Sequence, residues 1–174
     1  ALNSYENRVY DLKLDDGSHV VSKFYRPGRW NREQILEEHA FLFQLQEDEI
    51  PICAPLKLND GSTLRKTQGI YYAIWPRTGG RAADELMDEN LQVMGRLLAR
   101  IHNVGAVKEI EHRTTLTGET YGLKPLVFLK ENSFLPARLV KRYSDAVHEI
   151  VTIFDTLSAE VPFHRIHGDC HFGN

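Results

Sequence analysis

The chain has 174 residues, of which 42% are hydrophobic, enough to bury the core of one large or two small globular domains. Its 21 basic and 24 acidic residues give a net charge of −3, which excludes a general attraction to nucleic acid or to an anionic membrane. No apolar run approaches the roughly 20 residues of a membrane-spanning helix. The composition therefore predicts a soluble cytoplasmic protein without nucleic-acid or membrane partners, and it leaves the oligomeric state open.

The first elements along the chain are predicted to form a β-hairpin. Residues 8–14 and 19–25 alternate between polar and apolar side chains, and the turn signal DDGS separates them. Because successive side chains of a strand point to opposite faces, Lys23 shares a face with Val21 and Tyr25. The pattern thus places a lysine beside apolar side chains.

A helix is predicted to begin after Asn31. This residue is typical of an N-cap, and Gln34, three residues later, completes a capping box. Glu38 falls on the apolar stripe of this helix, three residues after Ile35. Because an unpaired buried carboxylate is costly, Glu38 is expected to find a cation, and Lys23 is the first candidate.

Three further strands are predicted before a domain boundary. The segments IPICAPLKL, TLRK and IYYAIWP have the composition of antiparallel strands, so residues 1–76 are expected to form a five-stranded sheet with one helix. A crossing rich in Pro and Gly follows at 76–84, where the composition shifts toward helix. We therefore predict an N-terminal nucleotide-binding lobe over 1–76 and a partial C-terminal lobe over 77–174.

The C-terminal lobe is predicted to be mainly helical, which makes the chain an α+β protein. Asp88 can cap a helix that ends near Gly105, and a second long helix covers residues 137–158. Residues 106–130 have weak periodicity and are expected to be rich in loops. A short strand, VPFHRI at 161–166, then leads into the final stretch.

The final eight residues, HGDCHFGN, hold the densest group of reactive side chains in the chain. With a strand lysine and a helix glutamate fifteen residues later (38 − 23), they resemble the protein-kinase-like fold in its aminoglycoside phosphotransferase and choline kinase branch, whose catalytic loop has the pattern H-G-D-x-x-x-x-N. The stretches LNSYENRVY, VSKFYRPGRW, QILEEHAF and TGGR are also similar to bacterial serine/threonine protein kinases of the stress response within that branch.

The resemblance implies a two-lobed, ATP- and Mg²⁺-dependent phosphotransferase that acts on protein serine or threonine. Phosphoryl transfer depends on positioning and on neutralising negative charge, so Lys23 would hold phosphate oxygens of ATP and Glu38 would keep this lysine aimed. Asp169 would accept the proton of the incoming hydroxyl, and Asn174 would bind Mg²⁺. His167 and His171 are expected to support the loop.

Further ATP contacts are predicted in the first loop and in the hinge strand. The segment NSYENR at 3–8 has no glycine, but its polar groups can offer donors to phosphate; an ordinary hairpin turn is the alternative. The strand YYAIWPRT offers backbone groups to an adenine edge, although Trp75 could equally belong to the core. The predicted ATP-binding residues are Ser4, Tyr5, Glu6, Asn7, Val21, Lys23, Ile74, Trp75 and Pro76.

Other functions stay open at this point. The acceptor could be a small hydroxyl compound such as an aminoglycoside, choline or homoserine, because the fold does not determine the acceptor. A scaffold that binds nucleotide without turnover is a second alternative. A second metal-binding aspartate would follow Asn174 by about 20 residues, so we expect a longer parent protein, and residues 1–174 alone to be inactive. A zinc cluster of His164, His167, Cys170 and His171 is disfavoured, because no second ligand pair has zinc-finger spacing.

Overall fold

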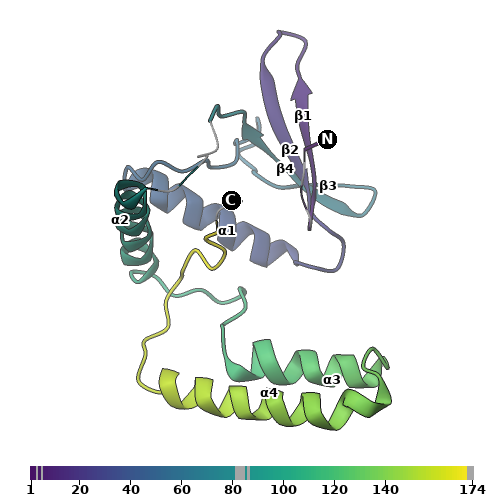
Figure 1. Cartoon of the computed structure of the whole chain (residues 1–174). Coiled ribbons are helices and arrows are strands. Elements are labelled where there is room, and N and C mark those ends of the chain that lie inside the picture. Colours follow the sequence, from purple (N-terminus) through teal and green to yellow (C-terminus); the bar gives the residue numbers. More distant parts are fainter. Residues whose placement is uncertain (3, 5, 81–84, 86, 172–174) are drawn as a thin grey trace. The chain divides into compact units, whose positions relative to one another are not determined.

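The computed structural model describes the chain except for residues 3, 5, 81–84, 86 and 172–174. It combines an antiparallel sheet with helices, which confirms the α+β class (Figure 1). Contacts divide the chain into two compact units: Ala1–His112 together with His164–Asn174, and Arg113–Phe163. The lobe boundary expected at residue 76 stays a prediction.

The sheet has four strands among the described residues, in the order β1-β2-β4-β3, with every neighbouring pair antiparallel. The hairpin of β1 and β2 is confirmed, with the turn in the predicted place. In the centre of the sheet, Lys23 of β2 is paired with Ala73 of β4. The strands are β1 (Arg8–Lys13), β2 (His19–Phe24), β3 (Arg65–Thr67) and β4 (Ile70–Pro76).

The prediction of a fifth strand was wrong. Residues 51–58 have no regular secondary structure. Pro51 and Pro55 lack an N–H group, so this segment cannot donate a regular ladder of hydrogen bonds. The Leu56 N–H donates one bond, 2.7 Å long, to the carbonyl oxygen of Ile74. The segment is therefore tethered to β4 without becoming a strand of the sheet.

Helix α1 (Arg32–Glu47) covers one face of this sheet, and its start is as predicted. The Asn31 side chain accepts a hydrogen bond from the Gln34 N–H (2.8 Å), and the Gln34 side chain accepts one from the Asn31 N–H (3.0 Å). These two bonds satisfy N–H groups that have no partner within the helix. The buried core between helix and sheet consists of Tyr25, Ile35 and Ala73.

Helix α2 (Asp88–Gly105) ends at the predicted glycine but begins differently. Met87 occupies the N-cap position, where its N–H donates to the side chain of Asn90 (3.0 Å), and Asp88 is the first helical residue. The strand predicted at 161–166 is also wrong, because this segment has no regular secondary structure. Its Arg165 side chain instead donates hydrogen bonds to helix α2 and to a side chain of α1.

The second unit contains a π-helical turn η1 (Glu119–Leu123), α3 (Lys124–Glu131) and α4 (Ala137–Ser158). The bounds of α4 are those predicted, whereas η1 and α3 lie in a region expected to be rich in loops. Close packing against α4 stabilises them: a Cβ on Gly118 would lie 2.6 Å from the side chain of Val151. No helix in the described part of the chain combines the length and apolarity needed to cross a membrane.

Candidate active site

Lys23 and Glu38 lie together, with Nζ 3.5 Å from Oε1. Their side chains are 25% and 26% exposed, so water screens the pair less than it screens an ion pair on the open surface. The Lys23 ammonium also lies 4.8 Å from the ring centre of Tyr25 and 5.5 Å from that of Trp75, where the aromatic faces attract a cation. One carboxylate and two rings thus hold the lysine on the face of the sheet that α1 covers.

A buried histidine next to Glu38 fastens α1 to the sheet. His39 is 1% exposed, and its ring nitrogens lie 3.0 Å from the Tyr25 hydroxyl and 2.8 Å from that of Thr63. Burial lowers the pKa of His39 to about 4, so its ring is neutral near pH 7. Because His39 directly follows Glu38 in α1, these bonds also restrict the position of the Glu38 backbone, from which the carboxylate extends.

The hinge strand brings several predicted residues close to this pair. Val21 and Trp75 are partners in the register of β2 and β4. Trp75 also packs edge-on against His39, with ring centres 5.7 Å apart, as expected of a core residue. The carbonyl of Ile74 accepts from the Leu56 N–H, and that of Pro76 lies 3.7 Å from the Cys53 sulfur. Each carbonyl has a second lone pair that a ligand could use.

Residues of the N-terminal segment border a hollow. The Asn7 N–H donates to Ser4 Oγ (3.3 Å), and Glu6 pairs with Arg29 (3.3 Å). Ser4, Glu6 and Asn7 border a hollow of about 860 Å³ whose described lining includes Phe24 but not Lys23. The same hollow is also bordered by Phe24 and Tyr25, the two residues that follow Lys23 in the chain. Tyr5 lies outside the described residues.

The loop predicted to be catalytic turns at Gly168, whose φ of +75° favours glycine. This turn brings both predicted support residues to Asp169: its N–H donates to His167 Nδ1 (3.3 Å), and its Oδ1 lies 3.6 Å from His171 Nε2. The Asp169 side chain is 75% exposed. An exposed carboxylate can be reached by an incoming hydroxyl group, so this position suits the predicted base.

The predicted metal ligand Asn174 lies outside the described residues. Within the part of the chain that the structure describes, no three His, Cys, Asp or Glu side chains are grouped so that they could hold a metal ion. The two cysteines, Cys53 and Cys170, are free thiols. Among the described residues, the structure thus brings the predicted Lys23 and Glu38 together, and it places the predicted base Asp169, exposed, in the closing loop.

Comparison with known proteins places these features in one family. Residues 1–174 match the phosphotransferase enzyme family along their whole length. The chain belongs to this family. It is 39% identical over 174 residues to "Stress response kinase A" of Escherichia coli (strain K12), and 36% identical to "Serine/threonine protein kinase RdoA" of Salmonella typhimurium (strain LT2). Each match covers 99% of this chain and 53% of the relative, so the chain spans about half the length of these relatives.

A solved structure shows that the fold of this family member is that of a kinase. It is described as amicoumacin kinase hAmiN in complex with AMP-PNP, Ca²⁺ and Ami, and it matches with a TM-score of 0.71 at 17% identity. The match covers 99% of this chain and 53% of that protein. At such low identity the likeness concerns the fold alone, and it confirms the kinase-like fold expected from the sequence.

Two buried polar residues of this family member were missed by the sequence analysis. His39 lies four residues after Ile35 on the same face of α1, and this spacing is the signal that could have revealed its burial. Arg165, which is 8% exposed, lies in the stretch VPFHRI. A lone guanidinium in such an apolar stretch indicates a buried charge that needs partners. Both residues hold segments that carry predicted site residues.

Proposed function

We propose that the full-length protein transfers the γ-phosphoryl group of ATP to the hydroxyl group of a serine or threonine in a protein. The observation that carries this proposal is the 3.5 Å pair of Lys23 and Glu38, presented by a sheet and a helix of kinase-like fold. The names of two relatives, a stress response kinase and a serine/threonine protein kinase, support the acceptor class and a role in stress response. The free thiols suit the cytoplasm as the compartment.

Lys23 is proposed to bind phosphate oxygens of ATP. Its ammonium is a positive charge that this part of the sheet can offer to a polyanion, and the ion pair with Glu38 orients it. The neighbouring rings of Tyr25 and Trp75 restrict the lysine further. A lysine that is already held in place loses little conformational freedom when the nucleotide binds, so ordering this side chain costs little of the binding free energy.

Asp169 is proposed to orient the acceptor hydroxyl and to take its proton. Its side chain is exposed at the turn of the closing loop, where an acceptor can reach it. Asn174 is proposed to bind Mg²⁺ through its amide oxygen, and bound Mg²⁺ would neutralise charge on the phosphate oxygens. His167 and His171 would restrict the directions that the aspartate can adopt.

A phosphate-transfer assay tests the proposal. Full-length protein is incubated with labelled ATP, Mg²⁺, a generic protein substrate, and separately with an aminoglycoside, choline or homoserine. We expect label on serine or threonine of the protein. Label on a small alcohol would instead identify a small-molecule kinase, and ATP binding without transfer to any acceptor would identify a non-catalytic scaffold. We also expect residues 1–174 alone to lack turnover, and full activity of this segment would contradict that expectation.

Two substitutions with matched controls assign the roles. Asp169→Asn should abolish turnover while ATP binding stays nearly intact, and Lys23→Ala should impair both. Asp15→Asn in the exposed turn after β1 and Lys13→Ala at the exposed end of β1 make the same chemical changes away from the site and should be neutral. Full activity of Asp169→Asn would show that this residue is not the base.

A further inference from the structure

We propose that Arg165 is a positioning residue that fastens the Asp169 loop to α1, the helix that carries Glu38. It precedes Asp169 by four positions (169 − 165), within the segment that leads into the loop. The inference rests on the proposed function, because positioning has a catalytic consequence only if Asp169 acts on the acceptor. The observation behind it is that the Arg165 side chain contacts both α1 and the end of α2.

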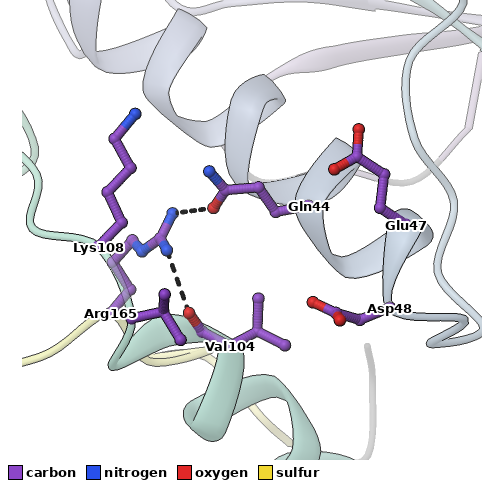
Figure 2. Close-up of a pocket in the computed structure, with 7 residues that line it drawn as sticks. Gln44, Glu47, Asp48, Val104, Lys108 and Arg165 are labelled. Carbon is purple, nitrogen blue, oxygen red and sulfur yellow. Dashed lines mark hydrogen bonds between the residues drawn. The ribbon is translucent and has the colours of Figure 1, made fainter.

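The guanidinium of Arg165 is enclosed by partners from two helices (Figure 2). One terminal nitrogen donates to Gln44 Oε1 of α1 (2.6 Å) and the other to the Val104 carbonyl of α2 (3.2 Å), while Nε donates to the Gly105 carbonyl (3.3 Å). The guanidinium carbon also lies 4.3 Å from the ring centre of Phe41. Hydrogen bonds and a cation–π contact thus act on the same group.

The charge of Arg165 suits this location. Carbonyl groups at the end of a helix have no partner within the helix and carry partial negative charge, so a cation at the end of α2 is favourable. Burial lowers the pKa of Arg165, and the Glu37 carboxylate opposes this shift. Arginine nevertheless stays protonated in proteins. Removing one partner would therefore leave a buried cation with too few hydrogen-bond acceptors. This cost favours the single arrangement of the segment in which all partners are present.

Helix α1 connects this anchor to the lysine site. Gln44 lies six residues after Glu38 (44 − 38), a rise of about 9 Å along an α-helix. Because a helix is stiff over this distance, a shift of α1 would move the partner of Lys23 and the partner of Arg165 together. Through α1, the position of the loop that carries the proposed base Asp169 therefore depends on the same helix that positions Lys23.

The backbone beside Arg165 also belongs to this anchor. The Arg165 N–H lies 3.4 Å from the Gly105 carbonyl oxygen, so the main chain and the side chain meet the same residue. A hollow of about 280 Å³ next to the guanidinium is bordered by Lys108 and Asp48, among others (Figure 2). A shorter or differently shaped side chain at position 165 would face this space and would not reach all three oxygens.

The test uses kinetics of the full-length protein with four variants of the anchor and one control variant. Arg165→Met removes the charge, and Arg165→Lys keeps it but loses the planar fork that reaches several acceptors. Gln44→Leu removes the α1 acceptor, whereas Gln44→Glu keeps an acceptor for the guanidinium. Arg96→Met, on the exposed side of α2, is the matched control. Turnover per nucleotide-binding site, KM for ATP, and hydrogen exchange of residues 164–171 are measured for each protein.

We expect Arg165→Met and Arg165→Lys to lower kcat about 10- to 100-fold, as misplacement of a reacting group does. KM for ATP should stay within about twofold, because these changes spare the nucleotide-binding residues. Amide exchange of 164–171 should be faster in both variants and in Gln44→Leu. Gln44→Glu and Arg96→Met should behave like the wild type.

The inference is overturned if Arg165→Met lowers only the unfolding temperature or the fraction of active protein, with turnover per site and loop exchange unchanged. It is also overturned if turnover falls while exchange of 164–171 stays as in the wild type. If the wild-type protein transfers no phosphoryl group to any acceptor, the proposed function fails, and the exchange data still decide whether Arg165 holds the loop.

Discussion

Substituting Gly105 by alanine tests the contact between α2 and the loop segment without changing any charge. A Cβ at this position would overlap the carbonyl oxygen of Arg165 and lie 3.0 Å from its carbonyl carbon. Gly105 is buried, and the obstacle is backbone, which cannot rotate away as the end of a flexible side chain can. The segment that contains Arg165 must therefore move when the methyl group is added.

Gly95 in the same helix is the matched control, because nothing lies within 4 Å of a Cβ built there. Alanine is favoured over glycine inside a helix by about 0.5–1 kcal/mol, so Gly95→Ala should stabilise the protein by that amount. Gly105→Ala gains at most the same but adds overpacking, which costs about 1–3 kcal/mol. The two chemically identical substitutions should therefore shift the free energy of unfolding in opposite directions.

Urea unfolding of both variants, followed by the intrinsic tryptophan fluorescence, measures the difference. In the transfer assay, Gly105→Ala should also lower kcat, because the Asp169 loop follows the displaced segment. Equal stabilisation by both substitutions would refute the reasoning, since it would mean that the end of α2 does not pack against Arg165.

Three further outcomes follow from the described contacts. The pKa of His39 is about 4 in the folded protein against an ordinary value of 6.5, so the unfolded chain binds the proton first as the pH falls. The free energy of unfolding should therefore fall by up to about 3 kcal/mol as the pH drops from 6.5 to 4. Urea titrations at several pH values should show this loss in the wild type and not in His39→Gln. Glu38→Gln should weaken ATP binding about five- to tenfold in calorimetry while Glu33→Gln, exposed in the first turn of α1, does not; equal effects would contradict the ion-pair argument. Gly122→Ala should destabilise the protein by about 1–3 kcal/mol because the added methyl group meets Val151, and an unchanged unfolding midpoint would show that η1 and α4 are not packed as described.

Local patterns predicted a large part of the fold and of the candidate site. The capping box at Asn31, the hairpin turn and the bounds of α4 depend on residues close together in the chain, and the structure confirms them. The pairing of Lys23 with Glu38 was also predicted, because the face of a strand and the stripe of a helix follow from periodicity. Asp169 was identified by the spacing of its motif, and its catalytic role stays a prediction.

Other features could not be predicted because they depend on partners distant in the chain. The fifth strand is different, because Pro51 and Pro55 already showed in the sequence that residues 51–58 have too few N–H donors for a ladder. Residues 119–131 form helices although their periodicity is weak, since packing against α4 stabilises them. Ser4, Glu6 and Asn7 border one hollow together with Phe24 and Tyr25, which no local pattern indicates.

The sequence by itself determined which side chains are candidates for the chemistry and which face of each element they occupy, because backbone periodicity and capping act within a few residues. Tertiary structure alone decided how those side chains are held. His39 requires hydroxyl groups from two other segments, and Arg165 requires oxygens 60 and 121 positions earlier in the chain. A buried polar group is stable only where folding brings such partners to it, and no sequence neighbour can supply them.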